Sequence, residues 1–242
     1  MLPDALARIE RDLPDDARLL DVGGWAAPLE RADWVIDLLP YDTRGLYGHT
    51  DPARERFTSE TWVQRDICDR EPWPFEDDSF DFVVCAQTLE DIRDPVFVCS
   101  EMARVARAGY IECPSWRTEL TPGVNGEWTG FSHHRWLVRC DQARGAVEFV
   151  FKFHTVHVDP YRFPKQPVPE TQRDTWLWWE GSFAARERII MEPPELDAEL
   201  RAFVAEHASP SPSPSPSPPS PPSRRRWPHW RRTSRNEPPG TQ

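Results

Sequence analysis

Two groups of residues follow predicted strands and combine backbone freedom with negative charge. Asp21, Gly23 and Gly24 close one short apolar run, and Asp37 lies near the end of the next one. Glycine lets a ligand approach the backbone closely, and amides at the start of a helix can meet a carboxylate. An ionised carboxylate can accept hydrogen bonds from both hydroxyls of a ribose. These residues indicate a nucleoside site with Asp37 or Asp42 as the ribose ligand, while ordinary turn and strand-end roles stay open.

A separate set of four residues can take up a proton. Glu90 and Asp91 follow a long apolar run, and His133 and His134 precede a predicted hairpin. A carboxylate or an imidazole within hydrogen-bond reach of a hydroxyl can act as a general base. These four residues are the candidate catalytic residues, although a structural role stays open for each. We predict no metal site, because His133, His134 and Cys140 lack the usual spacing of zinc ligands.

The elements that must position these residues alternate between strand and helix patterns. The run 80–87 is nearly continuous and apolar, as a central parallel strand buried on both faces requires. Asp94 and Pro95 are typical of a helix start, and Gly109 of the position just past a helix end. The other expected strands cover residues 18–22, 34–39, 62–67 and 110–113. This alternation predicts an α/β domain with a mostly parallel sheet.

Further patterns predict the elements at the two ends of the domain. Leucine and isoleucine recur at helical spacing over residues 2–13, and a last amphipathic helix is expected over 196–204. Alternating apolar residues predict an antiparallel hairpin with strands 135–140 and 146–153. The tryptophan-rich segment 176–179 is expected either to line an acceptor pocket or to close the core.

Composition and charge exclude several classes of protein. The 242 residues allow one domain with an appendage, and the net charge of −11 argues against nucleic acid as the main partner. The five cysteines are odd in number and widely spaced, which favours reduced core thiols over disulfides. The chain has no apolar run long enough to span a membrane, and its first residues lack a secretory signal. We therefore expect a cytoplasmic protein.

The composition changes sharply near residue 207. Alternating Ser and Pro cannot build a packed core, so residues 208–242 are expected to be a disordered linker that ends in a basic tail. That tail holds six arginines with Trp227 and Trp230. It is either a solvated appendage or a contact for an anionic surface or an acidic partner. The predicted domain accordingly covers residues 1–207.

The order of these pieces resembles the class I S-adenosylmethionine-dependent methyltransferases, of the type 11 kind. The resemblance extends over roughly residues 15–155, and Trp25 stands where these proteins usually carry a glycine. It implies a Rossmann-like three-layer sandwich with a mostly parallel sheet and a C-terminal antiparallel hairpin, and S-adenosyl-L-methionine as cofactor. The matching segments are LLDVGG (19–24), VIDLLPYD (35–42), RDICD (65–69), PWPFEDDSFDFVVCAQTLEDIRDP (72–95), EMARVARAGYIECPS (101–115) and GFSHHRWLV (130–138).

The resemblance also implies roles for individual residues. Asp37 is expected to bind the ribose of the cofactor. The methionine part is expected to contact Asp21, Gly23 and Gly24, and the adenine to contact Asp66 and Ile67. The residues expected near the sulfonium are Cys85, Ala86 and Gln87. Many relatives carry His where Gln87 stands, so a base role for that His does not transfer. Only a short helix, bounded by Pro28, fits between the glycines and Asp37.

The resulting hypothesis is methyl transfer to a small molecule or to a glycan or lipid-linked saccharide precursor. One alternative is a degenerate cofactor fold that serves as a binding module. Another is an NAD(P)-dependent oxidoreductase, because a glycine-rich loop and an acid after the second strand are shared features. Trp25 and Pro28 disfavour it, since they stand where the dinucleotide fingerprint requires glycine or alanine.

Overall fold

The computed structural model describes residues 1–48, 51–158 and 161–208. It contains a six-stranded sheet in the order β3-β2-β1-β4-β5-β8. Neighbouring strands are parallel except for β8, which is antiparallel to β5. The strands are β1 Leu19–Val22, β2 Trp34–Asp37, β3 Trp62–Gln64, β4 Phe82–Ala86, β5 Ala108–Pro114 and β8 Asp174–Glu180. This order confirms the predicted α/β fold with a mostly parallel, Rossmann-like sheet.

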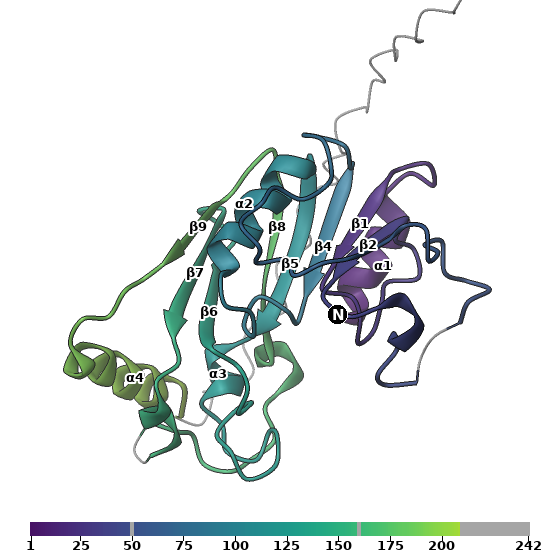
Figure 1. Cartoon of the computed structure of the whole chain (residues 1–242). Helices are drawn as coiled ribbons and strands as arrows, with labels where there is room; N and C mark the ends of the chain where they lie inside the picture. Colours follow the sequence, from purple (N-terminus) through teal and green to yellow (C-terminus); the bar gives the residue numbers. More distant parts are fainter. Residues whose placement is uncertain (49–50, 159–160, 209–242) are drawn as a thin grey trace, which may run out of the picture. The chain divides into compact units, whose positions relative to one another are not determined.

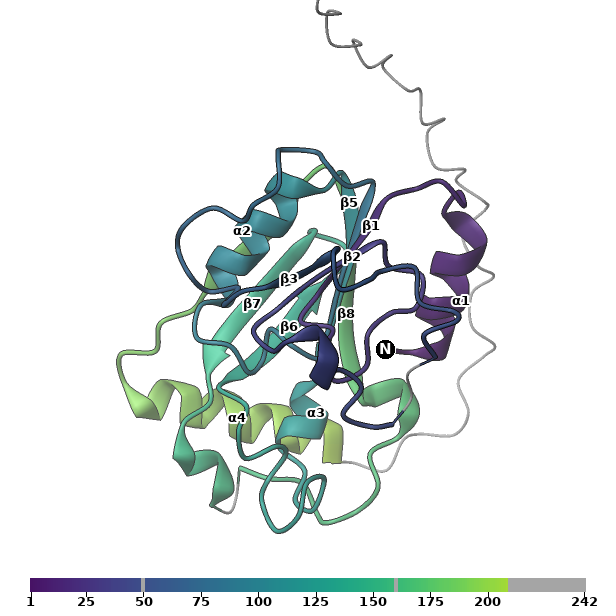
Figure 2. The same cartoon turned by 45° about the vertical axis from the view of Figure 1, so that its right-hand side comes forward.

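The remaining elements flank this sheet. Helices α1 (Pro3–Asp12) and α2 (Pro95–Val105) lie on opposite sides of it (Figure 1, Figure 2). A second sheet has the order β6-β7-β9, and its β6–β7 pair is the predicted antiparallel hairpin. The other elements are β6 Trp136–Asp141, β7 Ala146–Phe151, β9 Ala184–Glu187, α3 Trp116–Glu119, α4 Pro193–Ala208 and the 3-10 helices η1 Tyr41–Thr43, η2 His154–His157 and η3 Glu170–Gln172.

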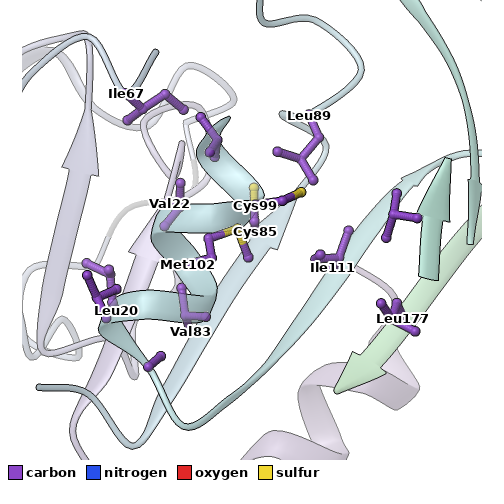
Figure 3. Close-up of a cluster of buried hydrophobic side chains, with 14 of the residues drawn as sticks. Leu20, Val22, Ile67, Val83, Cys85, Leu89, Cys99, Met102, Ile111 and Leu177 are labelled. Atoms are coloured by element: carbon purple, nitrogen blue, oxygen red, sulfur yellow. The ribbon is translucent and has the colours of Figure 1, made fainter. Parts of the chain in front are cut away.

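The main core lies between the large sheet and α2. Leu20 of β1 and Val83 and Cys85 of β4 meet Cys99 and Met102 of α2 (Figure 3), and all five are fully buried. The inner face of the hairpin extends the same core. Every cysteine of the chain is a free thiol in the structure, as expected for core cysteines. Side chains alternate between the two faces of β4, and those that point away from α2 lie on the side of the sheet where α1 packs. The strand is therefore buried on both faces.

The expected start of α2 is confirmed by its capping geometry. The Asp94 carboxylate accepts a hydrogen bond from the Phe97 backbone N–H at 3.2 Å, and Pro95 is the first helical residue. The helix ends at Val105, however, and Gly109 lies inside β5 instead of capping it. This glycine is required by packing, because a Cβ there would lie 2.6 Å from the Val83 carbonyl oxygen and 2.7 Å from the Trp179 ring.

The connection between β1 and β2 differs from the prediction. No helix, short or long, lies between Val22 and Trp34, a stretch that the structure describes completely. The loop is closed instead by two strand carboxylates, Asp21 and Asp37, which accept hydrogen bonds from its backbone amides. These two bonds fix both ends of the helix-free loop to the strands that it joins.

The tryptophan-rich segment closes the core. It forms most of β8, which pairs with the full length of β5. Leu177 and Trp179 are buried in the main core, and Trp178 stacks on Tyr110 on the opposite face, with ring centroids 4.4 Å apart. Residues 176–179 were expected either to line an acceptor pocket or to close the core, and their buried side chains close the core.

Two sequence-based expectations concern the ends and surroundings of the domain. Within the described ranges, no helix has the length and apolar content needed to cross a bilayer. The predicted linker and basic tail, with the boundary at residues 207 and 208, fall almost wholly on residues 209–242, which lie outside the described residues.

Substituting Gly109→Ala should destabilise the domain by about 2 kcal/mol or more, because the added methyl overlaps backbone and ring atoms that cannot move away cheaply. Urea unfolding measures the change. Gly126→Ala is the matched control: its Cβ meets no atom within 4 Å, and only its φ of +64° costs energy, about 1 kcal/mol. Equal losses for the two variants would contradict the packing account.

Candidate active site

The parallel strands end at one edge of the large sheet, and the predicted site residues gather there. Asp21 in β1 pairs in register with Val84 of β4, and Asp37 is the last residue of β2. Ala86 ends β4 beside Glu112 of β5. Ligands of open α/β sheets bind outside the carboxyl ends of the strands. The strand ends are therefore adjacent, as a shared cofactor site requires.

Asp37 is held at the end of β2 by two backbone amides. Its Oδ2 accepts a hydrogen bond from the Trp25 N–H at 3.0 Å, and its Oδ1 accepts one from the Leu39 N–H at 2.8 Å. The side chain is 8% exposed, and burial raises the pKa of the carboxyl although the amides lower it. A carboxylate oxygen can accept two bonds, so each oxygen keeps one acceptor position. Two adjacent ribose hydroxyls match these positions.

The glycine pair after β1 makes close contacts with side chains of the protein itself. Gly23 has φ +75°, and a Cβ there would lie 2.3 Å from Thr88 Cγ2. A Cβ on Gly24 would lie 2.2 Å from Asp21 Oδ2. Thr88 Oγ1 donates to the Gly23 carbonyl at 3.3 Å. Thr88 and Asp21 thus fill the space beside the glycines in which a cofactor's methionine part would approach the backbone.

Asp21 has a structural task in addition to its predicted one. Its Oδ2 accepts a hydrogen bond from the Leu29 N–H at 2.8 Å, across the β1–β2 loop. The residue is 4% exposed, and burial raises the pKa of its carboxyl to about 7, with the Asp37 charge adding to the effect. At neutral pH this carboxyl therefore exchanges readily between its protonated and ionised forms.

The indole of Trp25 lies toward η1. Its Nε1 donates to Thr43 Oγ1 at 3.0 Å, and its carbonyl accepts from the Gly45 N–H at 2.8 Å. Trp25 thus ties the β1–β2 loop to the segment after β2. The side chain that replaces the usual glycine serves this connection between two loops.

Asp66 and Ile67 follow β3, where the adenine is expected. Asp66 Oδ1 accepts from the Cys68 N–H at 2.9 Å, and its Oδ2 pairs with Arg93 Nη1 at 2.5 Å. Ile67 is 6% exposed and belongs to the main core. Asp66 thus meets the expected position at the strand end, whereas the Ile67 side chain packs mainly inward.

The residues that end β4 connect it to its neighbours. Cys85 is fully buried in the core, whereas Gln87 is exposed and has φ +58°. The Gln87 amide donates to Glu112 Oε1 at 3.2 Å and to Asp174 Oδ1 at 2.9 Å. Its side chain is therefore engaged with β5 and β8, while Ala86 is half-buried and offers backbone at the edge.

Two of the candidate catalytic residues meet in a buried cluster of ionisable side chains. His134 Nδ1 lies 2.7 Å from Glu119 Oε1, and His134 Nε2 lies 4.0 Å from Glu90 Oε1. The second Glu119 oxygen accepts from Lys152 Nζ at 2.5 Å. All four side chains are at most 7% exposed. We call Glu90, His134, Glu119 and Lys152 the buried charge cluster.

Glu90 is a member of the cluster whose carboxyl is partly protonated at neutral pH. Burial raises the pKa of Glu90 to about 7, against the opposing effect of the nearby His134. Glu90 Oε2 has no hydrogen-bond partner among the described residues. A carboxylate only accepts hydrogen bonds, so we assign the proton of His134 to Nδ1, which faces Glu119 Oε1. His134 Nε2 is then a proton acceptor that faces Glu90.

The other two candidates lie outside the cluster. His133 is exposed, with its ring centroid 4.5 Å from that of His134, and Asp91 is exposed beside Glu90. Sequence analysis missed Glu119 and Lys152. A signal for the lysine was present, because it is a charged residue within an apolar strand pattern and one of only two lysines in the chain.

A comparison with known protein families finds a match that includes part of this edge of the sheet. The family described as "methyltransferase domain" matches residues 48–111. The match includes Asp66, Ala86 and Glu90 and begins after the glycine pair and Asp37. The matched residues are thus similar to a methyltransferase domain, and the strand order is compatible with that similarity. The helix-free β1–β2 loop, which departs from the expected pattern, lies outside the matched residues.

Several solved structures are similar to parts of the chain. An S-adenosylmethionine-dependent methyltransferase from Aquifex aeolicus is 17% identical, with a TM-score of 0.35, over 47% of this chain and 64% of that one. The YcgJ protein of Bacillus subtilis is 18% identical, with a TM-score of 0.36, over 49% and 51% of the two chains. The [4+2]-cyclase SpnF is 21% identical, with a TM-score of 0.36, over 52% and 48%. The chain thus spans less than two thirds of each of these proteins, and no curated protein matches it.

The residues present fit the adenosine half of S-adenosylmethionine better than its methionine half. Asp37 keeps an acceptor position on each oxygen for the ribose, and Asp66 lies at the expected end of β3. At Gly23 the Thr88 side chain packs directly against the glycine, and its Oγ1 donates to the Gly23 and Ala86 carbonyls, each at 3.3 Å.

Replacing Glu90 by Gln should change how stability depends on pH. The native carboxyl has a pKa of about 7 against 4.5 in the unfolded chain, so the native state binds more protons between these values. Wild-type stability therefore decreases as the pH rises through this window, and Glu90→Gln lacks that loss. The variant should gain on the order of 2 kcal/mol relative to wild type between pH 5 and pH 8. Urea unfolding at both pH values tests this, and a pH-independent difference would contradict the raised pKa.

Substituting Asp37→Ala should weaken binding of S-adenosylhomocysteine at least tenfold, about 1.4 kcal/mol, because the ribose loses its acceptor. Isothermal calorimetry on the full chain measures the change. Asp42→Ala is the matched control, since Asp42 is the exposed alternative ribose ligand in η1. A loss in the Asp42 variant with Asp37→Ala unchanged would reverse the assignment.

Proposed function

We propose that the protein transfers the methyl group of S-adenosylmethionine to a hydroxyl of a small molecule or saccharide. The observation that carries the proposal is the buried pair Glu90 and His134, which lies just beyond β4 at the edge where Asp37 ends β2. In a methyltransferase domain, this edge provides both the cofactor site and the adjacent acceptor site. A group able to take a proton is needed there when the acceptor is a hydroxyl.

Cofactor binding is assigned to the residues at the strand ends. Asp37 would accept from the ribose hydroxyls, Asp66 from the adenine amine, and Gly23 and Gly24 would face the methionine part once Thr88 has turned away. When bound, the cofactor supplies an activated methyl group on a sulfonium. The protein then mainly has to align the acceptor oxygen with that methyl group and exclude water.

His134 is the proposed general base. Its Nδ1 proton is fixed by Glu119, so Nε2 is free to take the proton of an acceptor hydroxyl. Glu90, 4.0 Å from Nε2, stabilises the resulting imidazolium when its own carboxyl is ionised. His133 and Asp91 are exposed beside this pair, where they would contact the acceptor.

Glu119 and Lys152 are positioning residues in this proposal. Lys152 Nζ donates to the carbonyls of Thr129 at 3.2 Å and Phe131 at 2.9 Å, in addition to Glu119. Its ammonium therefore holds the segment before His133 and His134 against α3. This fixes the orientation of the His134 ring without contact between Lys152 and the reacting atoms.

A binding module without catalysis is the second candidate. It is favoured by one specific observation: Thr88 and Asp21 fill the space at the glycine pair, and Asp21 and Asp37 bond the loop amides. Cofactor binding without turnover on any acceptor would support it. The cytoplasmic location remains a prediction from the apolar runs and the first residues, and the exclusion of nucleic acid as main partner remains one from the acidic composition.

Methyl transfer can be tested without knowing the acceptor. The protein is incubated with methyl-labelled S-adenosylmethionine and a small-molecule extract of cells that lack it, and labelled products are separated by chromatography. We expect a labelled product with wild type. His134→Gln should form it about 100-fold more slowly while binding S-adenosylhomocysteine normally, because only proton removal is impaired.

His133→Gln is the matched control for this experiment, because it alters the exposed neighbouring imidazole. It should slow transfer less than His134→Gln does. Equal rates for wild type and His134→Gln would refute the base assignment. Absence of any labelled product from wild type, with S-adenosylhomocysteine bound, would favour the binding module.

A further inference from the structure

His157 accepts a hydrogen bond from the loop between α3 and β6, which carries His134. Its Nδ1 accepts the Thr129 backbone N–H at 3.3 Å. A ring nitrogen that accepts a hydrogen bond carries no proton, so His157 is neutral in this arrangement and its proton lies on Nε2. His157 is half-buried at the end of η2, and it belongs neither to the cofactor residues nor to the buried charge cluster.

The Thr129 N–H needs this acceptor because the residue is buried. Thr129 is 2% exposed. A buried backbone donor without a partner costs free energy, so the bond to His157 contributes to the stability of the loop. The preceding residue, Trp128, packs edge-on against the His157 ring, with ring centroids 5.3 Å apart. The imidazole thus contacts the loop through a hydrogen bond and through a ring.

The position of Thr129 matters for His134 through two sets of contacts. The Phe131 ring, two residues further along the loop, stacks on the His134 ring with centroids 4.5 Å apart and an interplanar angle of 23°. Lys152 donates to the carbonyls of Thr129 and Phe131 and also to Glu119. Glu119 in turn faces His134 Nδ1. A change at Thr129 therefore reaches the His134 ring through Phe131 and through Lys152.

Protonation of His157 is incompatible with the bond to Thr129. An imidazolium carries a proton on each ring nitrogen, so Nδ1 becomes a donor that faces the Thr129 N–H. Two donors repel each other, and the buried amide then has lost its acceptor. The charged ring must turn away, or the loop must move.

The surroundings of His157 keep the ring neutral at pH 7. Burial lowers its pKa below the ordinary value, and so do the charges of Lys152 beyond β7, His154 on η2 and Arg162 in the following loop. Glu119 of α3 has the opposite effect. The native state consequently takes up a proton at His157 only in mild acid, at a lower pH than the unfolded chain does.

We infer that His157 is a pH-sensitive latch on the loop that carries the proposed base. The neutral ring holds Thr129 and thereby the orientation of His134, and the charged ring releases the Thr129 amide and loosens the loop. The inference rests on the proposed function for the role of His134 and on the hydrogen bond alone for the latch. His157 is thus a positioning residue that acts through the loop.

Hydrogen exchange of the full chain, followed by NMR at pH 5 and at pH 7, tests the latch. After correction for intrinsic exchange rates, protection of the Thr129 amide in wild type should be about tenfold lower at pH 5. His157→Asn should keep its protection at both pH values, since a carboxamide oxygen accepts an N–H and does not titrate. Unchanged protection in wild type, or an equal decrease in His157→Asn, would overturn the inference.

Two further variants serve as controls for this experiment. His154→Asn alters an exposed histidine on the same η2 and should retain the pH-dependent decrease. Its midpoint should lie at slightly higher pH, because one charge that opposes protonation of His157 is removed. His157→Ala has no acceptor and should show low protection of Thr129 at both pH values. Wild-type protection in His157→Ala would contradict the latch.

The pH profile of methyl transfer separates this inference from the proposed function. Between pH 7 and pH 5.5, the transfer rate of wild type should decrease about threefold more than that of His157→Asn, because only wild type loses the latch. Equal decreases in the two proteins would contradict the positioning role. Expected exchange behaviour of Thr129 without methyl transfer by wild type would support the latch and contradict the proposed function.

Discussion

Two buried carboxylates, Asp21 and Asp37, hold the loop that joins β1 to β2. Each accepts a backbone N–H of this loop, from Leu29 at 2.8 Å and from Trp25 at 3.0 Å. Buried amides require partners, and these two carboxyl groups provide them. The arrangement keeps the ends of β1 and β2 adjacent and leaves acceptor positions on Asp37. The proposed cofactor site depends on this constraint, since without it the glycine pair and the ribose ligand would have no fixed relation.

A second constraint fixes the proposed catalytic side of the same edge. The buried charge cluster joins α3, the loop before β6 and the residues that follow β4 and β7, through side chains that have little access to water. Buried charges are costly unless they are paired, so the cluster orders the segment around His134 and makes its geometry sensitive to each member.

Much of the fold is predictable because its signals are local. The apolar run of β4 and the Asp94 cap of α2 depend on neighbouring residues, and the structure has both. The missing helix after β1 and the place of Gly109 in β5 depend on distant partners, Asp37 and Trp179, which no local pattern reveals. The same holds within the site. Glu90 was predicted from its place after a strand and His134 from its place on the loop before the hairpin, whereas Glu119 and Lys152 come together only through tertiary packing.

Calorimetry of the full chain with S-adenosylhomocysteine and, separately, with NAD tests the central claim most directly. The account predicts that S-adenosylhomocysteine binds one to one with a Kd below about 100 μM and that NAD does not bind at this concentration. The helix-free loop and Trp25 leave no dinucleotide fingerprint, while Asp37 is the proposed ligand of the ribose of the methyl donor. Binding of NAD in preference to S-adenosylhomocysteine, or of neither compound, would contradict the account.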